Sequence, residues 1–260
     1  MTETNQSLVS EASTNGDADH SAKVRGQSYT ALLDTLHGNL APATYFEIGT
    51  LHGNTLKLAK CSSIAVDPKF RITSDVIGTK PSCHFFQEPS DRFFRTRDPI
   101  KILGSEIDMA FLDGMHLFEF LLRDFMHTER FCRSNSVILL HDCLPPGFFM
   151  TVRDATDPLR KQSKFANWWT GDVWKIVPVL QKYRPDLSIT ITDSAPTGLV
   201  IITNLNPKST VLSDSYAEII REYSRTTICR KEYDKFWESV IITPMSEFSS
   251  LEQISTKLWI

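Results

Sequence analysis

The chain contains no C-x-x-C pair, no block of basic residues and no apolar run of membrane-spanning length. Its five cysteines are an odd number without metal-ligand spacing, which argues against a disulfide framework or a zinc site and predicts free thiols. A formal net charge of −3 over 260 residues argues against a basic phosphate-binding surface, so we expect no nucleic-acid partner. Nothing resembles a signal peptide or a membrane span, and we therefore expect a cytoplasmic protein without membrane contact.

Composition divides the chain into three parts. Residues 1–23 are mainly Ser, Thr, Asn, Glu and Asp, which predicts a disordered tail. Residues 24–207 alternate short apolar runs with amphipathic segments, which predicts one α/β domain. Residues 208–260 carry one helical stripe and several aromatic side chains, which predicts a helical extension. We interpret the extension as a cap over core surface, with a homodimer interface as the alternative.

The first amphipathic pattern lies just ahead of the first apolar run. Tyr29, Leu32, Leu33 and Leu36 have the spacing of one helix face, and Gly38 is placed to end the helix. We expect this helix to pack beside the sheet as scaffold.

Residues 45–53 predict a buried strand followed by a tight turn of the form Glu-x-Gly-x-x-x-Gly, with a helix over residues 54–60. Gly49 permits backbone angles closed to other residues and lets a ligand approach the main chain. The carboxylate of Glu47 suits a ligand with ammonium or hydroxyl groups better than a pyrophosphate. The alternative interpretation is an ordinary βα turn without a ligand.

A second apolar run, residues 63–66, ends in Asp67, which follows Gly49 by 18 residues. In doubly wound folds an acid at this place accepts hydrogen bonds from ribose hydroxyls, whereas the plainer interpretation is a turn residue before Pro68. Residues 83–86 predict a third strand. Ser90 follows it, placed either to cap a helix over residues 91–95 or to lie near an adenine edge.

Two further strands end in ionisable residues. Residues 107–112 lead into Asp113-Gly114-Met115-His116, and residues 136–140 lead into His141-Asp142. Because ligands of open α/β sheets bind at the carboxyl ends of the strands, we expect these side chains at one functional edge. An amphipathic helix follows His116, and we interpret its charged face, which includes Arg123 and Asp124, as solvated surface.

The segment 147–171 has no helix or strand period and mixes aromatic with charged residues, which predicts either a lid or substrate loop or a disordered insertion. Residues 187–192 and 198–203 then alternate as strands do. Their short connection leaves no room for a crossover helix, so we expect an antiparallel pair.

Together these features resemble the class I S-adenosylmethionine (SAM)-dependent methyltransferases, over about residues 45–204. The stretches 90–94, 107–116, 139–143 and 171–175 look more narrowly like a bacterial subgroup related to sugar and natural-product O-methyltransferases. The resemblance implies an α/β fold: a doubly wound, Rossmann-like, mostly parallel seven-stranded sheet with a terminal antiparallel strand pair. We expect helical N- and C-terminal extensions around it.

Carried onto this sequence, the resemblance implies SAM as cofactor and a set of residues around it. These are Glu47, Gly49, Thr50, His52 and Gly53 in the glycine turn, Asp67 at the ribose, Ser90 and Asp91 near the adenine, and Asp113 at the amino-acid end. Metal-dependent relatives hold a divalent ion on acids at the ends of strands four and five, which implies Mg²⁺ on Asp113 and Asp142. This chain has His141 where some relatives carry a second acid.

The function we expect is O-methylation of a small hydroxylated acceptor, such as a sugar or secondary metabolite. A neutral His116 would act as base, with a helix cap or strand-end hydrogen bond as its plainer role. Asp142 stays open between metal ligand, base and structural anchor, and we interpret His141 as structural. Two alternatives remain: a non-catalytic SAM-binding partner of a biosynthetic pathway, and a nicotinamide-dependent oxidoreductase. The oxidoreductase would require G-x-G-x-x-G, a spacing absent from residues 49–53.

Overall fold

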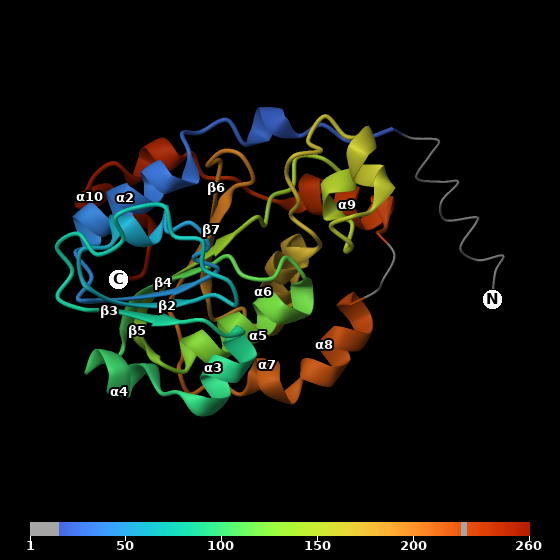
Figure 1. The fold of residues 1–260 in the computed structure, drawn as a ribbon. Coiled ribbons are helices and arrows are strands. Elements are labelled where there is room, and N and C mark those ends of the chain that lie inside the picture. Colours follow the sequence, from blue (N-terminus) through green and yellow to red (C-terminus); the bar gives the residue numbers. More distant parts are fainter. Residues whose placement is uncertain (1–15, 225–227) are drawn as a thin grey trace.

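The computed structural model describes residues 16–224 and 228–260. A seven-stranded sheet in the order β3-β2-β1-β4-β5-β7-β6 forms the centre of the fold (Figure 1). The strand β7 is antiparallel to β5 and β6, and the other pairings are parallel. This arrangement confirms the predicted fold class and the antiparallel pair. The strands are β1 (Thr44–Ile48), β2 (Ser62–Val66), β3 (Cys83–Phe86), β4 (Ile107–Leu112), β5 (Cys132–His141), β6 (Ser188–Thr192) and β7 (Leu199–Thr203).

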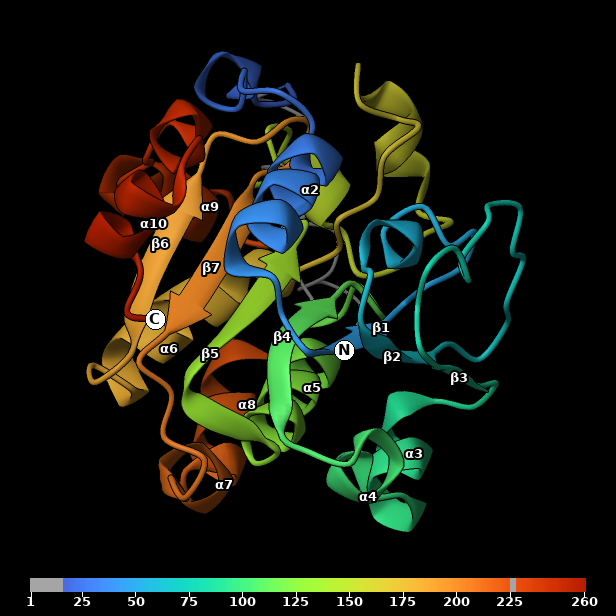
Figure 2. The ribbon, with the colours of Figure 1, turned by 90° about the vertical axis from the view of Figure 1, so that its left-hand side faces the viewer.

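The strand side chains alternate between two hydrophobic clusters, one on each face of the sheet. In β4, Met109 and Phe111 belong to one cluster, while Ala110 and Leu112 belong to the other. Helices α2 and α10 pack on the first face, and α3, α5, α6 and α8 on the second, as Figure 2 shows. Because helices cover both faces, the central strands are largely buried and nearly continuous apolar runs, apart from the exposed polar residues 133–135 of β5.

Helices precede the first strand and follow the last one, in addition to those between the strands. They are α2 (Tyr29–Leu40), α3 (Ser90–Thr96), α4 (Pro99–Leu103), α5 (Phe118–Glu129), α6 (Ile176–Tyr183), α7 (Val211–Asp214), α8 (Tyr216–Tyr223), α9 (Arg230–Ser239) and α10 (Leu251–Lys257). In the described ranges, none of them has the length and apolar character needed to cross a membrane.

Three helix boundaries differ from the predictions. Helix α2 passes through Gly38 and ends after Leu40, where Ala41 takes the left-handed conformation and donates to the carbonyl of His37. The helix expected over residues 54–60 is a single 3-10 turn, Leu56–Leu58, because the chain becomes extended at Ala59 before β2 begins. Helix α3 starts at Ser90 itself, so Ser90 does not cap it.

The described part of the N-terminal segment differs from the predicted disordered tail, whose residues 1–15 lie outside the described ranges. Asp17 accepts a hydrogen bond from the Phe149 amide (2.9 Å), and the His20 amide donates to the carbonyl of Pro146 (2.8 Å). Lys23 donates to the carbonyl of Trp237 in α9 (2.8 Å). These contacts are polar and join residues far apart in sequence, so they could not be predicted from a local apolar pattern.

Candidate cofactor pocket and His–Asp cluster

A pocket of about 640 Å³ opens at the carboxyl ends of β1, β2 and β4. Tyr29 of α2 and Phe120 of α5 contribute to its wall. The predicted cofactor residues that line it are Gly49, Thr50, His52, Asp67, Ser90, Asp91 and Asp113. Two predicted residues, Glu47 and Gly53, are not part of the lining. The edge at which the sequence predicts ligand binding is therefore hollow.

The glycine turn lies directly on the end of β4. The Gly49 amide donates to the carbonyl of Val66 (3.0 Å), and its backbone has a φ of +86°. A Cβ at this position would overlap the carbonyl oxygen of Asp113. Glycine is required here both by the left-handed backbone and by the close approach of two main chains.

The carboxylate of Asp67 closes the same turn from the β2 side. One oxygen accepts from the Leu51 amide (2.8 Å) and the other from the Lys69 amide (2.7 Å). A carboxylate oxygen has two lone pairs, so each retains one acceptor site for a hydroxyl in the pocket. This geometry fits the predicted ribose role, and it also gives Asp67 the turn-stabilising role that we considered as the alternative.

Glu47 does not lie where the sequence interpretation put it. Its side chain is fully buried, and Oε2 accepts from the hydroxyl of Tyr45 (2.7 Å). Side chains alternate along a strand, so residues 45 and 47 share the face covered by α2 instead of meeting at the strand's end. Burial raises the pKa of Glu47 to about 7. Glu47 is therefore not an anionic carboxylate lining the pocket, as the sequence suggested, but a buried side chain with a raised pKa outside the lining.

Asp91 is engaged by a cation of α5. Arg123 donates to its two carboxylate oxygens from Nε (2.9 Å) and Nη2 (2.7 Å), which lowers the pKa of Asp91. Asp124, predicted on the solvated face of α5, is instead buried at 2% exposure. It packs against the turn at Gly114, and burial raises its pKa to about 7. The helix presents this acid to the end of β4 because α5 begins only a few residues after that strand.

Four ionisable side chains meet where β4 and β5 end. Nε2 of His116 lies 3.3 Å from both Asp113 Oδ1 and Asp142 Oδ2. Nδ1 of His141 lies 3.2 Å from Asp113 Oδ1 and 3.6 Å from Asp142 Oδ1. The two strand endings that the sequence singled out therefore form one His–Asp cluster. Asp113 also lines the pocket, so the cluster adjoins the candidate cofactor site.

Three partners of this cluster were not predicted. The hydroxyl of Thr197, before β7, donates to Asp142 Oδ1 (2.6 Å), and the ring of Tyr29 lies 3.9 Å from that of His141. The carbonyl oxygen of Trp169, in the 147–171 segment, lies 2.5 Å from Nδ1 of His116. Tyr29 could have been predicted as a site residue, because it is the first residue of a helix beside the sheet edge. The Trp169 contact could not, because every residue type has a backbone carbonyl.

Asp142 has an unusual backbone for a residue with a side chain. Its φ of +59° lies in the left-handed region, and its side chain is largely buried. Aspartate tolerates this region better than most residues, and such conformations concentrate at functional sites. The hydrogen bond from Thr197 fixes the carboxylate that this turn presents to His116.

The cluster favours the protonated form of both histidines. Burial opposes a charge on His116, but the carboxylates of Asp142 and Asp113 outweigh it and raise the pKa of His116 to about 9. The pKa of His141 is raised in the same way, against burial, by Asp142 and Asp113. The pKa of Asp113 is lowered, despite burial, by His141 and His116. The neutral His116 expected from the sequence is therefore not its resting form at neutral pH.

Asp113, His141 and Asp142 also form a set that can hold a metal ion. One ligand atom from each lies within 4.8 Å of the others. Asp113 Oδ1 and His141 Nδ1 are buried without a well-directed hydrogen-bond partner in the described part of the chain. These two atoms lie 3.2 Å apart and form an ion pair when His141 is protonated; with His141 neutral, they become two ligand atoms that fit a cation between them. The donor set includes His141, which we had interpreted as structural.

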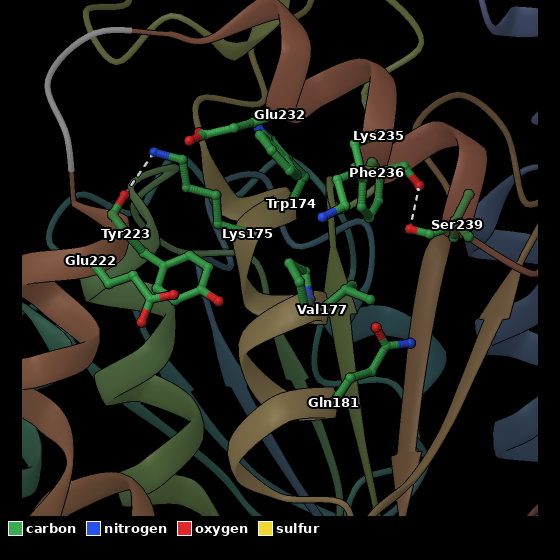
Figure 3. A pocket seen from close by; sticks show the side chains of 12 residues that line it. Trp174, Lys175, Val177, Gln181, Glu222, Tyr223, Glu232, Lys235, Phe236 and Ser239 are labelled. Carbon is green, nitrogen blue, oxygen red and sulfur yellow. Dashed lines mark hydrogen bonds between the residues drawn. The ribbon is translucent and has the colours of Figure 1, made fainter.

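A second pocket, of about 310 Å³, lies between α6, α8 and α9. Figure 3 shows Trp174, Lys175, Val177 and Tyr223 around it, with Lys175 donating to the carbonyl of Tyr223 (2.9 Å). This pocket shares no lining residue with the first, and no Asp or His lines it. The His–Asp cluster thus adjoins the pocket at the strand ends, while the second pocket has Glu and Lys as its charged lining residues.

Comparison with known proteins gives a match of the same region to a family model. Residues 24–143 match a methyltransferase domain. No protein of curated function matches the sequence. Similar solved structures include cofactor-bound Rv0187 from MTB (15% identity, TM-score 0.49, 68% of this chain and 80% of that chain). They also include the O-methyltransferase TomG from Streptomyces achromogenes with SAM (13%, 0.47, 68% and 79%). A third is the O-methyltransferase from Bacillus cereus with S-adenosylhomocysteine (12%, 0.47, 76% and 89%).

The fold and the pocket define a doubly wound α/β protein that binds a ligand at its strand ends. The domain match over residues 24–143 favours a SAM-dependent methyltransferase, with SAM as the ligand expected in the pocket. The match likewise favours a methyltransferase over the nicotinamide-dependent oxidoreductase that we considered as an alternative.

The approach of the Gly49 turn to Asp113 gives a first prediction. Gly49→Ala should weaken SAM binding at least tenfold, because the new Cβ forces apart two main chains that line the pocket. Gly104→Ala is the matched control: Gly104 has a φ of +82° but nothing within 4 Å of the added Cβ. Calorimetric titration with SAM measures both. Equal affinities in the two variants would contradict the prediction.

The burial of Glu47 gives a second prediction, on stability. Its pKa rises from 4.5 in the ordinary case to about 7 when folded, so the folded state binds more protons between these values and stability falls as pH rises through them. Glu47→Gln removes this term. Relative to wild type, the variant should gain about 3 kcal/mol in unfolding free energy between pH 4 and pH 8. Urea denaturation at both pH values measures the gain, and a pH-independent difference would contradict it.

Proposed function

We propose that this methyltransferase acts on a hydroxyl group of a small acceptor, such as a sugar or secondary metabolite. The observation that carries the proposal is the His116–Asp142 pair, 3.3 Å apart, beside the SAM pocket. A hydroxyl must lose its proton as it is methylated, and this pair supplies a proton acceptor at the required place. A pocket of about 640 Å³ for both cofactor and reacting group favours a small acceptor.

The reaction is an in-line displacement. The acceptor oxygen forms a bond to the methyl carbon as the carbon–sulfur bond of SAM breaks, and S-adenosylhomocysteine leaves. The hydroxyl proton passes to the His116–Asp142 pair, either to the Asp142 carboxylate or to Nε2 of His116 after that nitrogen has released its own proton. The protein otherwise contributes alignment of the three reacting atoms.

The pocket residues divide between the parts of the cofactor. Asp67 has free acceptor sites for the ribose hydroxyls, and the Gly49 turn allows close approach to the main chain. Ser90 and Asp91 line the side assigned to the adenine, and Asp113 the side assigned to the amino-acid end. We place the reaction in the cytoplasm, in keeping with five free cysteines.

A third prediction tests the proton acceptor. His116→Ala should leave the SAM dissociation constant within about twofold of wild type and lower turnover about 10²-fold, the usual contribution of a general base. The measurement is S-adenosylhomocysteine release over a panel of hydroxylated sugars and phenols, with product mass to locate the methyl group. His84→Ala, on the edge strand β3, is the control histidine. SAM binding with methyl transfer only to nitrogen or carbon would overturn the proposed function.

We further propose that a divalent cation assists, held by Asp113, Asp142 and His141. When bound, such an ion acidifies and orients a coordinated hydroxyl. The sequence resemblance implies Mg²⁺. The two carboxylates suit Mg²⁺ and Mn²⁺ alike, while the imidazole favours a transition-metal ion, so we name Mn²⁺ as the better fit to the mixed donor set.

A fourth prediction follows for the metal. Mn²⁺ should bind the wild-type protein more tightly than Mg²⁺, and Asp142→Asn should weaken Mn²⁺ binding at least tenfold, as the loss of one anionic ligand requires. Calorimetric titration without acceptor measures this directly. Asp75→Asn, an exposed acid outside the pocket lining, is the control. Unchanged Mn²⁺ affinity in Asp142→Asn would remove the metal from the proposal.

A further inference from the structure

The 147–171 segment touches His116 at its ring. Nδ1 of His116 lies 2.5 Å from the carbonyl oxygen of Trp169, and the two rings are 5.3 Å apart. A carbonyl oxygen only accepts hydrogen bonds, so Nδ1 carries a hydrogen and donates it. The other ring nitrogen, Nε2, is thereby left to face Asp113 and Asp142. In histidine sites, the partner of one ring nitrogen determines the chemistry of the other.

The same segment also touches the main chain of His116. Gly171 has a φ of +55°, and a Cβ there would overlap the carbonyl oxygen of His116. The next residue, Asp172, accepts a hydrogen bond from the Phe118 amide at the start of α5 (2.9 Å). Residues 169–172 therefore contact His116 at its ring and its carbonyl, and fix the chain two residues beyond it.

The contacting stretch is itself anchored from within the segment. The indole Nε1 of Trp169 donates to the carbonyl of Val152 (2.7 Å). The Gly171 amide donates to the carbonyl of Met150 (3.1 Å), and the hydroxyl of Thr170 donates to the same carbonyl (3.2 Å). Met150 is buried, so the anchor is fixed to the core of the protein.

We propose that residues 169–172 are a positioning element for His116: the Trp169 carbonyl fixes which ring nitrogen faces the two carboxylates, and Gly171 is the position that allows the contact. This inference rests on the proposed role of His116 as proton acceptor. The contacts with the ring and the main chain of His116 give these four residues a part in orienting the proposed base.

A fifth prediction tests Gly171. Gly171→Ala should lower kcat about 10²-fold, the usual effect of misplacing a catalytic group by about 1 Å, while the dissociation constant of SAM stays within twofold. The matched control is Gly78→Ala, since Gly78 has a φ of +49° and nothing within 4 Å of an added Cβ. If kcat and SAM affinity fall together, or if both variants behave alike, the positioning role is overturned.

A second readout needs no acceptor. In protein labelled with ¹⁵N-histidine, the Nδ1–H of His116 should give a slowly exchanging, downfield proton signal, assigned by its loss in His116→Gln. This signal should disappear or move upfield in Gly171→Ala and persist in Gly78→Ala. Persistence in Gly171→Ala would overturn the inference even if no hydroxylated acceptor is methylated. The proposed function and the positioning role can therefore fail separately.

A milder variant covers the case in which Gly171→Ala does not fold. Trp169→Phe keeps the ring but removes the hydrogen bond to Val152, so the carbonyl is held less firmly. We expect kcat to fall about fivefold, the loss typical of one hydrogen bond, with the SAM dissociation constant unchanged. A wild-type kcat together with an unaltered His116 signal in this variant would count against the proposal.

Discussion

The main chains of β1 and β4 meet at their carboxyl ends, and the rest of the site depends on this contact. The Asp113 amide donates to the carbonyl of Ile48 (2.9 Å), and Gly49 then turns against the Asp113 carbonyl without a side chain between them. Asp113 belongs both to the cofactor pocket and to the His–Asp cluster. The contact therefore sets the distance between the pocket and the His–Asp cluster.

The cluster balances its charges internally. Two carboxylates are removed from most of the solvent, and each lies near two imidazoles whose pKa values they raise. Buried charges of one sign would be costly without such partners. The same balance has a chemical consequence: because His116 is protonated at neutral pH, the site must release that proton, or use a carboxylate, before it can accept a proton from a hydroxyl. A cation on the two aspartates would oppose the protonated state by the same electrostatics.

Much of this could be predicted from sequence because it is local. A buried parallel strand is a short apolar run, and the residue after it must lie at the sheet edge, so Asp67, Asp113 and Asp142 are found from their position alone. The sequence predictions were wrong where burial depends on which face of a strand or helix a side chain occupies. Glu47 has the right residue type and nearly the right position, but strand alternation buries it with Tyr45. Asp124 likewise occupies a charged helix face in the sequence and a buried site in the fold.

The conformation of the 147–171 segment could not be predicted from sequence for a different reason: the residues that contact it lie far away in the chain. Asp17 binds the Phe149 amide, while Tyr233 and Trp237 of α9 both donate to the carbonyl of Pro145 (2.9 and 3.1 Å), just before the segment. Its far end is fixed through Asp172 to α5. No local period encodes contacts of this kind. The pocket is built from strand ends and their turns, whereas both chain extensions contact the 147–171 segment or the residues just before it.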